Sequence, residues 1–351
     1  MTAPHDFKFD ADGGTSARSR VATAWSAWPG RLLRAAFAIL PLGWLARRLD
    51  LRAVAHDAAA VGGVTLFLSF LAVFSSVLVG CVRWRWMLFS YGAHSPPPLG
   101  DLLRHNLVGQ YFNVLPSGVA GDAVRGHRVR HCLPDAATSY TVIFVERLAG
   151  LLGLCTIAAV AMAASESLRT GPLAWTLDLA VLGGVTLTLV SLGLPSLLAR
   201  HASLRATVAR IPVVGGVIVR VPPPRSLTGL FGAVGLSVVT QGALVVSVAL
   251  LIRRLSAAAG LVVCARVVPG VILFTYVPLT PGGVGQREWA FAYLFGQAGV
   301  AREAAVATSL LFFALMMSLA ALGGLSLVGE RAVLSRAAAR MRNTRTSSTE
   351  H

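Results

Sequence analysis

Long runs of hydrophobic residues, separated by short polar segments, dominate the pattern along this chain. Runs of this kind are typical of transmembrane helices, which need about 20 apolar residues to cross a bilayer. The predicted helices cover Arg31–Ala46, Val64–Val82, Ser139–Ala164, Leu173–Leu198, Leu227–Ile252 and Arg302–Val328. The pattern therefore predicts an all-α integral membrane protein rather than a soluble domain.

Two further segments are only partly apolar and are interrupted by Pro and Gly. Asp101–Pro116 is too short and too polar for an ordinary span, and Gly260–Gly285 is apolar but broken by prolines and glycines. Each leads into a Pro/Gly turn that is followed by charged residues. Three predicted full helices separate the two segments, so we expect them to enter from opposite faces. This pattern is typical of an inverted repeat whose broken helices meet near the membrane midplane.

The ends of the chain set the expected topology. Both are basic, which by the positive-inside rule places both termini in the cytoplasm and requires an even number of crossings. Six crossings satisfy this if both broken segments are re-entrant, and eight satisfy it if both span, so six to eight transmembrane helices are predicted. We expect a disordered cytoplasmic tail at residues 1–30, a transmembrane domain at 31–328 and a basic cytoplasmic tail at 329–351.

Composition supports this interpretation. Only 13% of the 351 residues are charged, against about a quarter in soluble domains. The net charge of +16 comes from 31 basic and 15 acidic residues, but the arginines flank apolar runs, which fits the positive-inside rule and attraction to anionic lipid headgroups and argues against nucleic acid as a partner. His127 and His131 lack a third metal ligand, so no metal is predicted. No phosphate-binding loop or other cofactor motif occurs.

Glu146 and Arg147 are the most informative charged pair. They lie seven and eight residues into the predicted helix Ser139–Ala164, among apolar neighbours. Charge at that depth costs a few kcal/mol or more and normally faces a partner or a water-filled cavity. The alternative is that Arg147 extends toward the interface and Glu146 only locks helix packing. We interpret the pair as part of a binding site.

The first broken segment supplies a second group of candidates. Glycine admits close approach of an anion to backbone N–H groups, and arginine offers a planar fork that suits phosphate. An ordinary turn, with Asp122 capping the next helix and Arg125 on the membrane surface, is an equally open interpretation. The candidate substrate-binding residues here are Asn113, Ser117, Gly118, Gly121, Asp122 and Arg125.

The second broken segment supplies the remaining candidates. Non-helical backbone at membrane depth is tolerated only where protein buries it or water reaches it. We expect its arginine to join Arg125 and Arg147 around a phosphate, and its glutamate, with Glu146, to hold those arginines or to titrate. The candidates are Thr280, Gly282, Gly283, Gly285, Arg287 and Glu288. No catalytic constellation is apparent, so an enzyme is not predicted.

Three motifs in order resemble a known family. They are Asn113-x-Leu115-Pro116-Ser117-Gly118-x-x-Gly121-Asp122-x-x-Arg125, then Glu146-Arg147, then Pro281-Gly282-Gly283-x-Gly285-x-Arg287-Glu288. Together they resemble the lysylphosphatidylglycerol synthase transmembrane region family of flippase-like inner-membrane proteins. The likeness runs from about Arg31 to Val328. In members with a full synthase, the membrane part moves an aminoacylated phosphatidylglycerol between leaflets and a separate soluble domain makes that lipid.

The resemblance implies a function in lipid transport. We expect this chain to lack the soluble synthase domain, because it ends soon after the last predicted helix. The expected function is a lipid translocase that moves or binds an anionic phospholipid or a lipid-linked phosphate. The alternative is a non-catalytic membrane subunit, or a membrane enzyme, of lipid or lipid-linked glycan metabolism. The expected partners are a membrane lipid and, in the alternative, a soluble cytoplasmic transferase or synthase; no oligomeric state is predicted.

Overall fold

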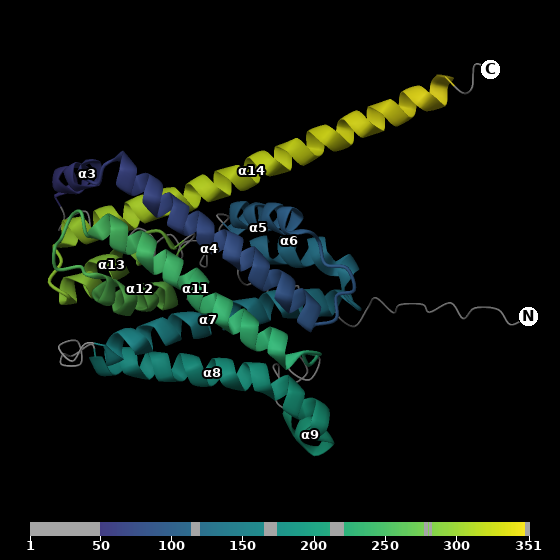
Figure 1. Ribbon diagram of the computed structural model, residues 1–351, viewed down its shortest axis with the longest axis horizontal. Helices are drawn as coiled ribbons and strands as arrows, with labels where there is room; N and C mark the ends of the chain where they lie inside the picture. Colours follow the sequence, from purple (N-terminus) through teal and green to yellow (C-terminus); the bar gives the residue numbers. More distant parts are fainter. Residues whose placement is uncertain are drawn as a thin grey trace, which may run out of the picture.

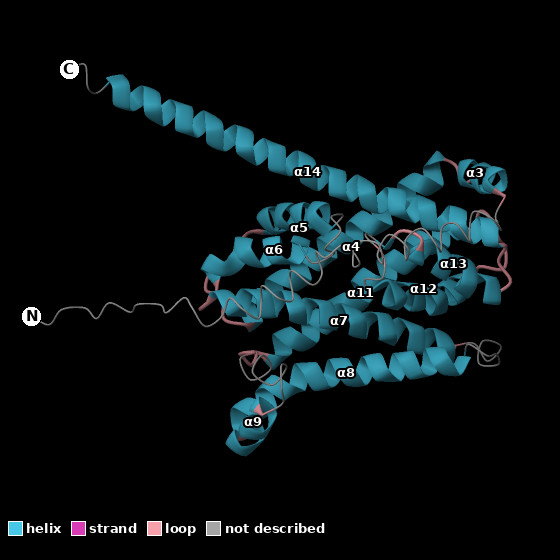
Figure 2. Ribbon diagram, turned by 180° about the vertical axis from the view of Figure 1, so that it is seen from behind, coloured by secondary structure: helices cyan, strands magenta, loops and turns pink. Residues whose placement is uncertain are grey.

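The structure, a computed structural model, describes residues 50–113, 120–164, 174–210, 221–276, 280 and 283–347. Within these ranges every regular element is a helix, as Figure 2 shows. The elements are α3 (Leu51–Ala60), α4 (Gly63–Ser90), α5 (Leu99–Asn113), α6 (Ala120–Val129), the short 3-10 helix η1 (Arg130–Cys132), α7 (Ala136–Ala163), α8 (Ala174–Arg200), α9 (Ala202–Ala209), α11 (Leu227–Ile252), α12 (Leu261–Tyr276), α13 (Gln286–Gln297) and α14 (Arg302–Ser347).

Long apolar helices form the frame of the molecule. Four segments of the described chain are long and apolar enough to cross a membrane, namely Gly63–Ser90, Ala136–Ala163, Thr228–Ile252 and Arg302–Gly329. Helix α8 is 27 residues long and lies beside α7 (Figure 1). The prediction of an all-α membrane protein is confirmed. The predicted helix Arg31–Ala46 and the predicted tail 1–30 lie outside the described residues.

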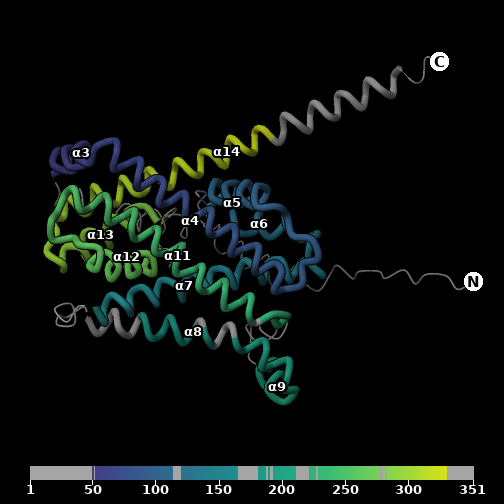
Figure 3. The backbone as a smooth tube through the Cα atoms, in the orientation of Figure 1, coloured from purple at the N-terminus to yellow at the C-terminus, as the bar shows by residue number. Residues whose placement is uncertain are grey.

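The two broken segments form helical hairpins at opposite ends of the bundle. Helices α5 and α6 lie between α4 and α7 in the chain, at the end of the bundle where α4 ends and α7 begins. Helices α12 and α13 lie between α11 and α14, at the opposite end (Figures 1 and 3). Each pair therefore enters and leaves at the same end. This is the re-entrant arrangement expected with six crossings. It differs from the alternative with eight crossings, in which both segments span the membrane.

Helix α4 is longer than the sequence predicted. We expected it to end at Val82, but it continues to Ser90 and so includes Arg83 and Trp84. Both residues lie inside the protein, with exposed fractions of 8% for Arg83 and 0% for Trp84. The prediction was wrong because the apolar residues after Trp86 continue the helix, so the arginine falls within the span instead of at its end.

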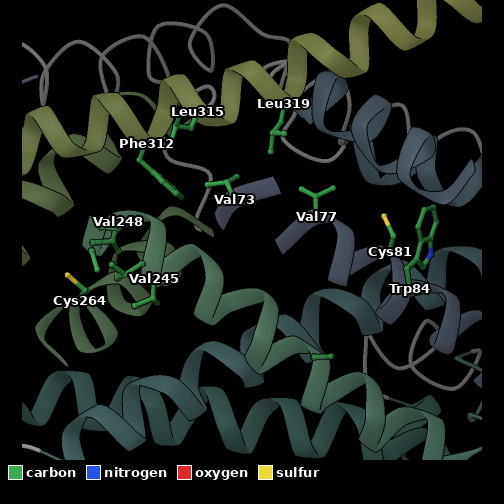
Figure 4. Close-up of a cluster of buried hydrophobic side chains, with 14 of the residues drawn as sticks. Val73, Val77, Cys81, Trp84, Val245, Val248, Cys264, Phe312, Leu315 and Leu319 are labelled. Atoms are coloured by element: carbon green, nitrogen blue, oxygen red, sulfur yellow. The ribbon is translucent and has the colours of Figure 1, made fainter. Parts of the chain in front are cut away.

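The apolar core lies where α4, α11 and α14 meet, and Figure 4 shows its side chains. Val73 and Val77 come from α4, Val245 from α11, and Phe312 and Leu319 from α14. Glycines bring α11 close to α4, since a Cβ atom on Gly232 would lie 2.3 Å from the ring of Trp86; close van der Waals packing drives helix association in lipid. The framework that results holds both hairpins in fixed positions.

Candidate functional site

A cluster of five charged side chains joins α4, α6 and α7 inside the bundle. The Nη2 atom of Arg83 lies 2.8 Å from Oε1 of Glu146, and Nη2 of Arg125 lies 2.6 Å from Glu146 Oε2. The second carboxylate, Asp122, pairs with Arg147 and lies 3.9 Å from Nη1 of Arg125. We call this set (Arg83, Asp122, Arg125, Glu146 and Arg147) the ionic cluster.

Glu146 is the centre of the ionic cluster. Its side chain is only 5% exposed, and each carboxylate oxygen accepts a hydrogen bond from a different arginine. A buried carboxylate needs this degree of pairing, because an unpaired charge in a low-dielectric interior costs several kcal/mol. The interpretation that Glu146 only locks helix packing is therefore incomplete, since it also fixes the positions of two cations.

Neighbouring polar and aromatic groups hold the two buried arginines. Arg83 donates from Nη1 to the hydroxyls of Ser237 and Thr240 on α11, at 3.1 and 3.2 Å. The guanidinium of Arg125 lies over the ring of Trp84, 4.3 Å from its centroid, which adds a cation–π attraction. Four helices thus contribute to one site.

The ionic cluster carries more positive than negative charge. Three guanidinium groups face two carboxylates. The side chains of Arg83 and Arg125 are 10% and 11% exposed, whereas that of Arg147 is 42% exposed. The accessible member of the ionic cluster is therefore a cation, and the excess charge suits an anionic ligand. A planar guanidinium can bind phosphate through two parallel hydrogen bonds.

Glycines at the start of α6 bring Asp122 and Arg125 into this position. A Cβ atom on Gly121 would lie only 2.0 Å from the carbonyl oxygen of Gly109 on α5. The N–H of Gly121 also donates to Oδ1 of Asn113, at 3.1 Å. Because α5 and α6 approach this closely, Arg125 points into the bundle. The alternative that placed Arg125 on the membrane surface was wrong.

An N-terminal cap fixes the start of α7, the helix that carries Glu146 and Arg147. Asp135 accepts hydrogen bonds from the backbone N–H and the hydroxyl of Thr138, at 2.7 and 2.8 Å. The bond from the backbone N–H, and to a lesser extent the one from the hydroxyl, holds the pKa of the Asp135 carboxyl below its ordinary value. Capping of this kind satisfies otherwise unpaired backbone donors and sets where the helix begins.

Both hairpins pack against α7, the helix that carries Glu146 and Arg147. Helix α6 contacts α7 near one end of the bundle, and α12 contacts it from the other. The two broken segments therefore approach the same helix from opposite ends.

Arg287 and Glu288 lie in a different place from the one expected. They pair with each other, and Nε of Arg287 donates to the hydroxyl of Ser309 on α14, at 3.1 Å. The guanidinium of Arg287 also lies 4.3 Å from the ring centroid of Phe313. The expectation that Arg287 joins Arg125 and Arg147 around one phosphate was wrong, because these contacts direct it toward α14.

Besides pairing with Arg287, Glu288 binds the backbone at the start of its own helix. Its Oε2 accepts a hydrogen bond of 2.6 Å from the N–H of Gly285, the residue that precedes α13, and so satisfies a backbone donor at the start of this helix. Gly283 and Gly285 have φ values of 71° and 81°, a region that residues with a side chain rarely adopt. The turn thus needs glycine for its conformation, while Thr280 nearby is buried. Of the remaining candidates, Ser117, Gly118 and Gly282 lie outside the described residues.

Sequence reasoning missed Arg83 and its partners on α11. The sequence did contain a signal for Arg83. If the apolar run is extended beyond Trp86, Arg83 falls inside a transmembrane helix, where a charged side chain needs a partner. Ser237 and Thr240 gave no comparable signal, because single hydroxyls are common in transmembrane helices and usually bond to their own backbone.

Comparison with known protein families shows to which family the chain belongs. The profile described as Lysylphosphatidylglycerol synthase TM region matches residues 31–324. The chain belongs to this family. No curated protein matches it. Membership of the lysylphosphatidylglycerol synthase TM region family relates the protein to lipid metabolism, and the ionic cluster lies within the matched region.

Proposed function

We propose that the protein translocates an anionic phospholipid, or another lipid with a phosphate group, between the leaflets of the bacterial inner membrane. The observation that carries this proposal is the accessible guanidinium of Arg147, which belongs to a cluster with three cations and two carboxylates at membrane depth. An excess cation buried in protein has a strong preference for an anion. A lipid phosphate is the anion that a membrane supplies.

The two hairpins support movement rather than static binding. One contributes Asp122 on α6 to the ionic cluster and the other packs α12 against α7, and they come from opposite ends of the bundle. A site shared between oppositely oriented halves is accessible to one side or the other when the halves rock against each other. The chain has no phosphate-binding loop for ATP, so we infer that lipid asymmetry or an ion gradient drives the movement.

The distribution of arginine supports an orientation. Arg200, Arg205 and Arg210 gather where α8 ends and α9 follows, and Arg225 precedes α11 at the same end (Figure 1). By the positive-inside rule, this end faces the cytoplasm. Labelling a cysteine introduced at Ser203 in a chain without its own cysteines tests this, with protection in intact cells as the expected result.

A vesicle assay tests the function. Purified protein is reconstituted with a trace of fluorescent phosphatidylglycerol, and dithionite added outside bleaches the label that reaches the outer leaflet. The wild-type protein is expected to expose the inner-leaflet pool, and Arg147→Ala to reduce the rate about tenfold or more, as expected for the loss of one charge-assisted contact of about 1.5–3 kcal/mol. Arg253→Ala, an exposed arginine at the other end of the bundle, is the matched control.

Two results would overturn the proposal. One is an equal rate for wild-type protein, Arg147→Ala and empty vesicles. The other is inert protein that copurifies with a soluble transferase or synthase, which would favour the role of a membrane subunit. Size-exclusion profiles of each variant show whether a lost rate reflects lost folding.

A further inference from the structure

An apolar groove lies on the flank of the bundle, away from the ionic cluster. It has a volume of about 430 Å³ and is lined by α7, α8 and α11. Leu152, Leu189 and Phe231 contribute to its wall, Gly193 leaves it wide, and Arg200 is the charged side chain in its lining. Leu189 and Phe231 are exposed, so the groove opens sideways, where the lipid of the membrane lies.

The groove is separate from the ionic cluster. Between them α7 crosses α11 so closely that a Cβ atom on Gly153 would lie 2.8 Å from the backbone carbonyl of Ser237. Ser237 is the residue that binds Arg83, whereas the groove uses residues nearer the start of α11, including Phe231. A ligand in the groove therefore occupies a site of its own.

The length of the groove matches one leaflet. Arg200 lies eleven positions after Leu189 on α8, which corresponds to about 16 Å at 1.5 Å per residue. The hydrocarbon core of a bilayer is about 30 Å thick, so half of it is about 15 Å. An acyl chain that starts at Arg200 therefore reaches the far end of the groove near the bilayer centre.

The charged end of the groove is set to receive an anion. No side chain among the described ranges pairs with Arg200, the last residue of α8. Helix α9 follows directly with Arg205, has no buried residue and projects from the bundle (Figure 1). Arg200 and Arg205 together place positive charge at this end of the groove, which attracts the headgroups of anionic lipids. The apolar groove thus fits the acyl chain of a phospholipid, and the cation at its end fits the phosphate.

We propose that this groove is a binding site for one anionic phospholipid that is not transported, with an acyl chain in the slot and the phosphate on Arg200. Such a lipid fills the space between α8 and α11 and attaches α8 and α9 to the rest of the bundle. It also makes the stability of this part of the protein depend on anionic lipid. This inference does not require translocation to occur.

Native mass spectrometry of the purified full chain tests the site. Phosphatidylglycerol or phosphatidylcholine is added to protein in detergent, and the lipids that remain bound are counted. Gly193→Leu fills the slot, since nothing lies within 4 Å of a Cβ atom at this position, and is expected to remove one bound lipid of either kind. Gly183→Leu is the matched control, because its position on α8 is equally open but lies outside the groove.

The arginine is tested separately. Arg200→Gln is expected to weaken the binding of phosphatidylglycerol at this site about fivefold, the effect of one basic residue at an anionic surface, and to weaken phosphatidylcholine binding less, because the choline of that lipid offsets the charge of its phosphate. Arg253→Gln is the control for loss of charge.

If Gly193→Leu leaves both lipid counts unchanged, or instead converts a dimer into a monomer, the groove does not bind phospholipid and the proposal is overturned. The ionic cluster is intact in all of these variants, so a failed lipid-transfer assay leaves this result standing.

Discussion

Arg83 and Glu146, from α4 and α7, form an ion pair whose nitrogen and oxygen atoms lie 2.8 Å apart, with both side chains almost fully buried. Arg125 occupies the other oxygen of Glu146, so one carboxylate fixes three helices against one another. Removing it leaves two buried cations without their partner. The consequences for stability and for function differ between members of the ionic cluster.

We expect Glu146→Gln to lower the free energy of unfolding by about 3–5 kcal/mol, the usual effect of breaking a buried ion pair from one side. Denaturation of the purified protein in mixed micelles measures it. Asp101→Asn is the control, because Asp101 is an exposed carboxylate in the first turn of α5 and is worth about 1 kcal/mol or less there. Equal losses for both variants would contradict the central role of Glu146.

Asp122→Asn is expected to separate lipid binding from lipid transfer. Asp122 is the carboxylate paired with the accessible Arg147, so it competes with a lipid phosphate for the same guanidinium. Without that competition, we expect phosphatidylglycerol to bind about tenfold more tightly, which corresponds to about 1.4 kcal/mol, and to leave the site more slowly. Equilibrium binding and the vesicle assay together measure the two effects. A variant that binds the lipid more weakly would show that Asp122 does not compete.

Gly323→Ala is expected to destabilise the protein by about 1–3 kcal/mol, the usual cost of overpacking. A Cβ atom at this position would lie 1.9 Å from the carbonyl oxygen of Leu107, so α14 and α5 would have to move apart. Gly329→Ala is the matched control on the same helix, since nothing lies within 4 Å of its Cβ position. Thermal unfolding in detergent compares the two. A larger loss at Gly329 would contradict the close helix crossing.

Asp135→Ala is expected to destabilise α7 by about 1 kcal/mol at neutral pH through loss of the cap. The hydrogen bonds from Thr138 lower the pKa of Asp135 below its ordinary value of 3.8. The stabilisation is therefore complete above that value and is lost as the pH falls through the lower pKa of the folded state. Asp135→Asn retains a capping oxygen and is expected to show a smaller and pH-independent loss. The unfolding midpoints of the three proteins between pH 7 and pH 3 test this.

Hydropathy predicted the long helices well because the bilayer imposes a length and an apolar composition on each crossing. It located the two interrupted segments from the polar residues of α5 and the prolines and glycines around α12, but it left open whether they span the membrane or return as hairpins. It failed at Arg83, where a helix boundary was placed at the first charge. It failed also at Arg287, since sequence order cannot show that Ser309 and Phe313 of α14 lie closer to this side chain than the ionic cluster does.

The hairpin formed by α5 and α6 has a consequence for how the protein is inserted into the membrane. Both of its ends lie at the same face of the bundle, so neither end has to be carried across the bilayer. Its polar residues, among them Asn106 and Arg125, would be unfavourable against lipid tails. The hairpin can therefore enter only after the long helices have gathered around the space that shelters it, which makes its docking a late step of assembly.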